Sequence, residues 1–247
     1  MLKTSPRFLP CIMAFGLMVL SACEVAGPAQ RPDTPAQPEQ TAAGTNIPAA
    51  ARAAARRFVT VVETVEPVAE RECRRRAPRS NCDFLIVVDD RPNQPPNAFQ
   101  TVDKFGRPVI AFNLGLIAAA RNEDELAFVM GHEAAHHIRA HLERQRRNAT
   151  AGAVIFAGLA GLTGGDASTI REAQELGAAV GARSYSKDFE LEADELGTVI
   201  AFRAGYDPLR GSEFFTRIPD PGNKFLGTHP PNRARIETVR KAMANIS

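Results

Sequence analysis

The 247-residue sequence has little excess charge, few cysteines and histidines, no internal repeat, and no hydrophobic run long enough to span a membrane. Hydrophobic residues make up 44% of the chain and charged residues 23%, which is the composition of a globular protein. Wholesale disorder, collagen and coiled coil are therefore excluded. The formal net charge is only +2, so the chain has no electrostatic footprint for nucleic acid. The four cysteines and five histidines are unevenly placed, and their positions carry most of the information on function.

The first 22 residues are organised as a secretory signal peptide. Lys3 and Arg7 precede an apolar stretch over residues 8–20, and small residues follow that stretch. The stretch is too short for a transmembrane helix, which needs ~20 apolar residues. Removal of residues 1–22 also removes Lys3 and Arg7, so the remaining chain has 28 basic and 28 acidic residues and no formal net charge.

The end of this segment, Leu20-Ser21-Ala22-Cys23, resembles the lipobox of bacterial lipoproteins, in which cleavage leaves the cysteine as an acylated N-terminus. The resemblance implies that Cys23 carries lipid, and Glu24 in place of aspartate after it implies sorting to the outer membrane. Residues 23–47 contain proline, alanine and glutamine with almost no large apolar side chains, which predicts a tether. We expect the folded domain to comprise residues 48–247.

Cys73 and Cys82 are the two cysteines left once Cys11 is lost with the signal peptide and Cys23 is acylated. An exported chain enters an oxidising compartment, so we predict a disulfide between them. Two buried free thiols are the alternative. No C-x-x-C motif of a zinc or redox site is present, so these cysteines are expected to be structural.

The hydrophobic pattern of residues 48–247 predicts an α+β fold that is mainly helical and contains a small β-sheet. A helix over residues 48–76 is expected to bend or stop near Pro67. Residues 149–165, rich in alanine and glycine, are expected to form a core helix or a mobile lid. The other expected elements are a strand at 84–88, a hairpin of strands 98–102 and 109–112 whose second strand lies at a sheet edge, and helices at 113–121, 123–147, 168–182, 186–204 and 231–246.

Four of the five histidines lie between residues 132 and 141, and His132-Glu133-Ala134-Ala135-His136 matches H-E-x-x-H. On a helix, His132 and His136 share one face and can take two corners of a tetrahedral zinc site. Glu133 can then accept a proton from the water that zinc activates. A chance match on a surface helix is the alternative, but the motif lies in the middle of a strongly predicted helix. His137 and His141 lie on another face of that helix, so they are expected to support the ligands or to lie on the surface.

A catalytic zinc takes a third protein ligand and keeps its fourth position open. The acids Glu190, Glu192 and Asp194 lie on a later predicted helix. Glu190 and Asp194 are four residues apart, so one can bind the metal while the other orients a ligating imidazole. By spacing alone, any of the three can be the ligand, or all three can form a solvated face.

Three motifs occur in the order H-E-x-x-H at 132–136, E-x-x-x-D at 190–194, and Thr228-His229-Pro230-Pro231 with Arg235. Together they resemble the HtpX and BepA type of zinc metallopeptidases, the group that includes the CAAX prenyl proteases. The match covers most of residues 50–245. It implies a zincin-like, or gluzincin, domain with one Zn²⁺ per chain. It further implies that Glu190 is the third zinc ligand and that Asp194 orients a ligand.

The same resemblance implies that His229 lies near the zinc, where it either stabilises the oxyanion or occupies the open coordination position. Capping of a helix is the alternative for this residue. Arg235 is expected to orient that segment or Asp194, with an ordinary surface charge as the alternative. An edge strand at 109–112 is expected to pair with an extended peptide.

The sequence therefore predicts a zinc-dependent metalloendopeptidase that hydrolyses peptide bonds of periplasmic or misassembled envelope proteins, with Glu133 as general base. It resembles the soluble, periplasm-facing branch of the family, anchored to the outer membrane by lipid. Expected partners are protein or peptide substrates, the membrane and envelope-assembly proteins. The alternative is a metal-containing, chaperone-like assembly factor with little proteolytic activity. The intact Glu133 favours chemistry, because a purely structural zinc needs no general base.

Overall fold

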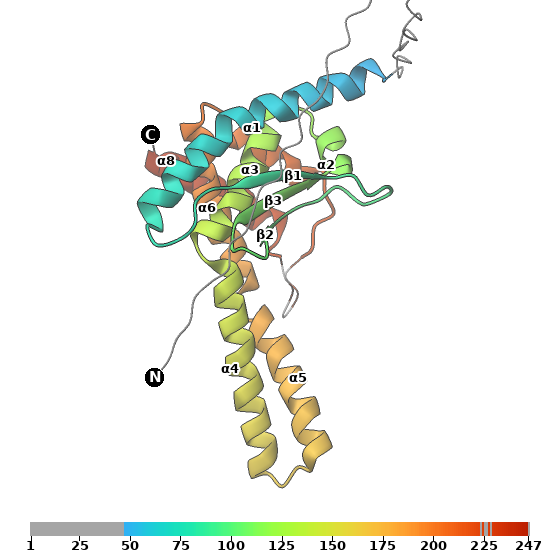
Figure 1. The fold of residues 1–247 in the computed structure, drawn as a ribbon, viewed down its shortest axis with the longest axis vertical. Helices are drawn as coiled ribbons and strands as arrows, with labels where there is room; N and C mark the ends of the chain where they lie inside the picture. The colour runs from blue at the N-terminus through green and yellow to red at the C-terminus, as the bar shows by residue number, and fades with distance from the viewer. Residues whose placement is uncertain (1–46, 223, 225–226, 228, 247) are drawn as a thin grey trace, which may run out of the picture. The chain divides into compact units, whose positions relative to one another are not determined.

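The computed structural model describes residues 47–222, 224, 227 and 229–246, which belong to one compact unit, Asn46–Ser247. The expected signal peptide, the acylated Cys23 and the tether up to residue 46 lie outside the described residues. The unit is mainly helical with one three-stranded sheet, as the sequence predicts (Figure 1). Its elements are α1 Ala49–Arg76, β1 Leu85–Asp89, β2 Ala98–Val102, β3 Pro108–Asn113, α2 Leu114–Ala119, α3 Glu123–Ile138, α4 His141–Leu162, α5 Ala167–Arg183, α6 Ser186–Arg203, α7 Pro208–Gly211, the 3₁₀ helix η1 Ser212–Thr216 and α8 Asn232–Ile246.

The sheet has the strand order β1-β3-β2, with β1 parallel and β2 antiparallel to β3. The β2–β3 hairpin forms where the sequence predicts it, with Ala98 opposite Phe112. The prediction that the second strand of this hairpin lies at an edge is wrong. β1 pairs with the other side of β3, so β3 is central and buried while β2 is an edge strand. Hairpin signals are local, whereas the β1–β3 pairing joins strands that are separated in the sequence by β2 and the loops on either side of it.

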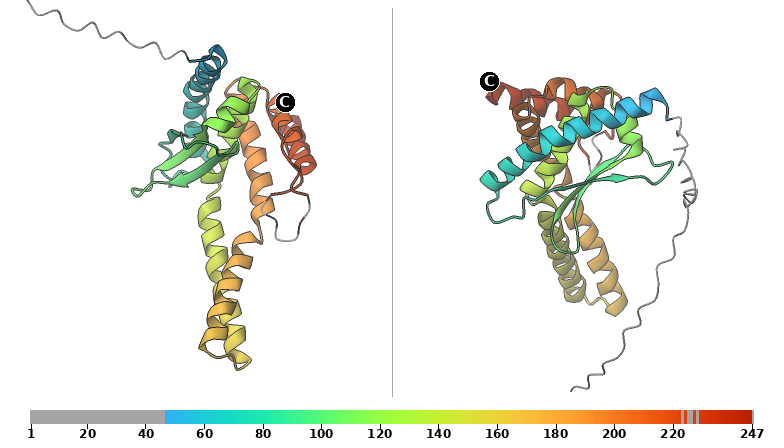
Figure 2. Two further views of the ribbon diagram at one scale, coloured as in Figure 1. Left: turned by 90° about the vertical axis from the view of Figure 1, so that its right-hand side faces the viewer. Right: turned by 45° about the horizontal axis from the view of Figure 1, so that its top comes forward.

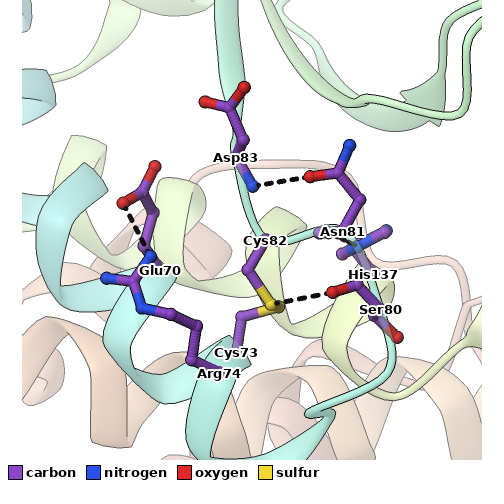
Figure 3. Close-up of a disulfide and its surroundings, with 8 residues drawn as sticks. All are labelled: Glu70, Cys73, Arg74, Ser80, Asn81, Cys82, Asp83 and His137. Atoms are coloured by element: carbon purple, nitrogen blue, oxygen red, sulfur yellow. Dashed lines mark hydrogen bonds and ion pairs between the residues drawn. A yellow bond between two sulfur atoms is a disulfide. The ribbon is translucent and has the colours of Figure 1, made fainter.

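Helix α1 is continuous through Pro67, contrary to the expected interruption. It buries one face, which includes Phe58, Val61 and Val65, while Pro67 lies on its exposed side. Packing of this apolar stripe outweighs the hydrogen bond that proline removes. At its C-terminal end, Cys73 forms a disulfide with Cys82 in the segment that leads to β1 (Figure 3). The disulfide therefore links the buried side of α1 to the segment that precedes β1.

Helix α3 begins where the sequence predicts, because the Asn122 side chain accepts a hydrogen bond from the backbone N–H of Glu125. The expected continuation of this helix to Arg147 is wrong. Ala140 adopts a left-handed backbone conformation with φ +54°, which separates the end of α3 from the start of α4. Alanine has the highest helix propensity, so nothing local marks this break. The contacts of His141, described below, supply the reason.

Helices α4 and α5 lie side by side as a hairpin that leaves the rest of the unit (Figures 1 and 2). Residues 149–165, expected as a core helix or a lid, form the outer part of α4 and the connecting turn. Gly152 and Gly177 bring the two backbones together, since a Cβ on either would overlap the other helix. Among the described residues, no helix is long and apolar enough to cross a membrane.

Candidate metal centre

The site is built on helices α3 and α6, which run in opposite directions and pack closely through glycine. A Cβ added to Gly131 would lie 2.8 Å from the carbonyl oxygen of Gly197, so a larger residue at either position would force the helices apart. The pair is enclosed by α1 and the sheet on one side and by α8 on the other (Figure 1). This packing brings side chains from residues 132–136 against side chains from residues 190–194.

His132, His136 and Glu190 direct nitrogen and oxygen atoms toward a common point. The His132 Nε2 and His136 Nε2 atoms are 3.0 Å apart, and the Glu190 carboxylate lies 3.6 Å from the first and 3.4 Å from the second. One candidate ligand atom from each residue lies within 4.8 Å of the others. Two imidazoles and a carboxylate form a donor set of the type that holds catalytic zinc, so the residues present fit such an ion.

The electrostatics of this group favour a charged carboxylate. Burial raises the pKa of Glu190, but hydrogen bonds from His136 and His229 and the nearby Arg235 outweigh it and hold that pKa well below its ordinary value. Burial lowers the pKa of His136, whereas its bond to Glu190 and the charge of Glu133 raise it, with a net increase. The two shifts share one cause, the close approach of imidazoles and carboxylates in a buried site.

Asp194 and Arg235 fix the position of His132. The His132 Nδ1 atom lies 2.9 Å from Asp194 Oδ1. Arg235, from α8, donates to both Asp194 oxygens, over 2.8 Å and 2.6 Å, and its guanidinium stacks on Phe215 with 3.9 Å to the ring centroid. All three polar residues are buried. The imidazole is therefore held with Nδ1 toward the carboxylate and Nε2 toward His136 and Glu190.

A second polar group lies behind His136, and it contains His141, which the sequence left either to support the ligands or to lie on the surface. His141 Nδ1 is 2.9 Å from His136 Nδ1, and His141 Nε2 is 3.1 Å from Glu192, which also pairs with Arg144. Burial, together with His136, lowers the pKa of His141 to about 4. Hydrogen bonds from Arg144 and His141 lower the pKa of Glu192 to about 2, against the effect of burial. The sequence signal for this contact is the five-residue interval from His136 to His141. On one continuous helix, however, two residues five positions apart do not face each other.

His229 lies in the segment before α8, with Nδ1 3.3 Å from Glu190 Oε2 and more than half of its side chain exposed. The Glu190 carboxylate raises the pKa of His229, although burial opposes this. His137, by contrast, lies outside the group and bonds through Nε2 to the backbone oxygen of Asn81 (Figure 3). The structure thus brings together the residues that the sequence proposes for the metal site, and it places His141 against His136 and Glu192 against His141.

A cavity of about 770 Å³ opens onto this group, and Glu133 lines it beside the three candidate ligands. The edge strand β2 contributes Ala98, Phe99 and Gln100 to its wall. Much of the remaining lining is apolar and comes from α3, η1 and the residues after it, including Phe128, Val129, Phe214, Phe215, Ile218 and Pro219. The group therefore faces a cleft large enough for several residues of a peptide.

Comparison with known proteins agrees with this geometry. The model of peptidase family M48 matches residues 55–243, which extend from α1 into α8 and include the whole group. The chain belongs to peptidase family M48. This membership confirms the resemblance inferred from the three motifs. It supports a peptidase activity, because every residue of the metal group lies within the part of the chain that defines the family.

Among similar M48 proteins are two named beta-barrel assembly-enhancing protease, from Escherichia coli and Yersinia pestis. Each is 31% identical to the chain over 179 residues, which are 64% of this chain and 33% of the relative. The mitochondrial metalloendopeptidase OMA1 of Saccharomyces cerevisiae is 28% identical over 167 residues, 64% of this chain and 46% of the relative. The chain thus spans about a third of the length of the beta-barrel assembly-enhancing proteases that it matches.

Proposed function

We propose that the chain is a zinc-dependent metalloendopeptidase. The observation that carries this proposal is the convergence of His132, His136 and Glu190 on one point beside Glu133 in the wall of a large cleft. Three protein ligands leave a fourth position for water or substrate, which distinguishes catalytic from structural zinc. In this proposal α3 is the active-site helix of a zincin-like domain.

The reaction assigns a distinct task to each side chain. Zinc, when bound, lowers the pKa of water and polarises the scissile carbonyl. The Glu133 carboxylate accepts the proton of the attacking water and delivers it to the leaving amide nitrogen. Asp194 and Arg235 hold His132 in one tautomer with Nε2 toward the site.

We assign His229 to the carbonyl oxygen of the substrate, where its imidazole donates a hydrogen bond as negative charge develops. Its exposed position in the cleft, next to Glu190, supports this role. His229→Ala is expected to keep zinc and to lose about 10²–10³ in kcat. An increase in activity would instead identify His229 as a group that blocks the open position at rest.

The cleft suits an extended, apolar polypeptide. Among the described residues, no strand pairs with the outer edge of β2, which lines the cleft beside the metal group. A substrate segment can therefore pair with the backbone of β2, the role that the sequence predicts for the strand at 109–112. The two arginines in the wall are already paired, Arg217 with Glu125 and Arg235 with Asp194, so neither is free for an acidic side chain. Unfolded or misassembled envelope proteins expose segments of this kind.

The proposal also includes the location of the chain, which we propose is exported to the cell envelope. Residues 1–22 are the signal peptide, Cys23 is the lipid anchor to the outer membrane, residues 23–47 are the tether and residues 48–247 are the peptidase domain that faces the periplasm. The Cys73–Cys82 disulfide supports this location, because such bonds persist in oxidising compartments.

A second candidate is a chaperone-like assembly factor with little proteolysis. The names of two relatives, beta-barrel assembly-enhancing protease, favour a role in assembly, although they also name a protease. The two functions separate in one experiment. The full-length chain and Glu133→Gln are incubated with unfolded casein, with and without a chelator. We expect cleavage that the chelator and the substitution both abolish, while Glu133→Gln still binds zinc. Bound zinc with no chelator-sensitive difference between the two proteins favours the assembly factor.

A further inference from the structure

We propose that His141 is a positioning residue for the ligand His136, acting through a chain of hydrogen bonds that continues to Glu192 and Arg144. The inference rests on the proposed zinc site, but it concerns groups that do not touch the metal. It also explains the break between α3 and α4, which allows His141 to contact His136.

The direction of each hydrogen bond in this chain follows from the atoms that face each other. His136 turns Nε2 toward His132 and Glu190, so this nitrogen must carry a free lone pair to bind a metal. The proton of a neutral His136 then sits on Nδ1, which lies 2.9 Å from His141 Nδ1. His141 must accept at Nδ1 and therefore carries its own proton on Nε2, which donates over 3.1 Å to Glu192.

Glu192 is the fixed end of the chain. Arg144 donates to both of its oxygens, over 2.6 Å and 3.2 Å, which keeps the carboxylate charged and correctly placed as an acceptor. A metal-bound histidine commonly passes its second N–H directly to a carboxylate or carbonyl oxygen. His132 does so with Asp194, whereas His136 reaches its carboxylate through one additional imidazole.

Packing holds the His141 ring in place. Its plane is stacked on Phe189 with 4.7 Å between the centroids and an angle of 8°, and the Arg144 guanidinium covers the same phenyl ring at 4.2 Å. Only 4% of His141 is exposed. A ring that is buried and stacked in this way cannot turn, so its Nδ1 stays directed at His136.

The left-handed Ala140 makes this contact possible. On a continuous helix, His141 would lie about 140° round the axis from His136 and would point away from it. Because Ala140 has φ +54°, α4 starts afresh at His141, and the imidazole turns back to the ligand. A positive φ is costly for alanine, so a contact of functional value offers a reason for it.

The test compares two substitutions at residue 141 in the full-length chain. His141→Phe keeps the stacked ring but removes the acceptor, whereas His141→Asn keeps an acceptor oxygen where Nδ1 lies. We expect His141→Phe to weaken zinc binding by roughly 10–100-fold in competition with a chelator. His141→Asn should recover most of that loss. His137→Phe, outside the group, is the matched control and should bind as the wild type does.

A second measurement separates positioning from a merely structural role. Proton–nitrogen spectra of the zinc-loaded chain should show the His136 proton on Nδ1 in the wild type and in His141→Asn, with a shifted or exchange-broadened signal in His141→Phe. Equal zinc affinity and identical His136 signals in all variants would overturn the inference. Equal weakening by both substitutions would overturn it too, because the acceptor that His141→Asn retains would then make no difference to zinc binding. A wild-type chain that binds no zinc would contradict the proposed function itself.

Discussion

Two antiparallel helix pairs dominate the molecule, and both use glycine to bring backbones together. In the pair α3–α6 the contact is Gly131 with Gly197, and in the pair α4–α5 it is Gly152 with Gly177. The first pair is buried, while the second leaves an apolar stripe uncovered, which includes Val154, Leu159 and Leu162. Every candidate metal ligand lies on the buried pair. Close helix packing alone therefore does not make the site, which also needs the surrounding elements that exclude water and fix side chains.

The largest expected effect tests which face of α6 holds the metal. Glu190 points into the group on α3, whereas Glu192 points to Arg144 at the base of the hairpin. Glu190→Ala removes one of the three proposed protein ligands, so we expect no zinc to remain bound after gel filtration. Glu192→Ala should keep one zinc per chain, with an affinity reduced several-fold by the loss of the chain through His141. Equal zinc content in both variants would contradict the assignment of the ligand.

The next effect compares the two glycine contacts directly. Gly197→Ala places a methyl group 2.8 Å from the backbone nitrogen of His132, so α3 and α6 must separate. We expect a loss of about 1–3 kcal/mol in the free energy of unfolding, together with weaker zinc binding. Gly177→Ala forces an even closer contact on the hairpin, with the carbonyl oxygen of Gly152, but zinc affinity should stay unchanged. Denaturant unfolding measures the stability of the two variants, and competition with a chelator measures their zinc affinity. An equal loss of zinc affinity in both variants would show that the hairpin supports the site.

A smaller effect concerns the ion pair that joins α1 to α6. Among the described residues, no such ion pair joins the two helices of the α4–α5 hairpin. The buried Glu72 accepts hydrogen bonds from Arg75 and Arg76 on α1 and pairs with Arg203 on α6. Burial raises its pKa, but these three arginines outweigh burial and lower that pKa below the ordinary 4.5. Glu72→Gln should destabilise the fold by about 1–2 kcal/mol at pH 7.

The sign of the pH dependence follows from the lowered pKa. The contribution of Glu72 is complete above pH 4.5, the unfolded value, and is lost as the pH falls through the lower native value. The difference in Tm between wild type and Glu72→Gln should therefore shrink on acidification from pH 7 to about pH 2. A difference that stays constant over this range would mean that the charge of Glu72 contributes nothing.

The features that the sequence predicts correctly are those that depend on local interactions. On α3 the proposed metal site depends on a four-residue spacing, which is a property of any helix, so the sequence indicates His132 and His136 directly. The start of that helix was also predictable, because the cap at Asn122 is a local interaction. The strands of the β2–β3 hairpin were recognisable for the same reason.

The features that the sequence did not reveal depend on contacts and backbone turns that no local sequence pattern marks. The central position of β3 comes from its pairing with β1, and the end of α3 comes from the turn at Ala140. The partnership of His141 with Glu192 joins residues 51 positions apart. Spacing alone left Glu190, Glu192 and Asp194 equivalent, and the packing of α6 on α3 gives each a different neighbour.

The smallest expected effect concerns the uncovered stripe of the hairpin. Leu162 is 87% exposed, so Leu162→Gln should change the free energy of unfolding by no more than about 0.5 kcal/mol. Leu196 on α6 is 1% exposed, and Leu196→Gln should cost about 3 kcal/mol or more, because it buries an amide without partners. Denaturant unfolding at two protein concentrations measures both. A large, concentration-dependent loss for Leu162→Gln would mean that another copy covers the stripe, and the contrast between an enclosed helix pair and an open one would no longer hold.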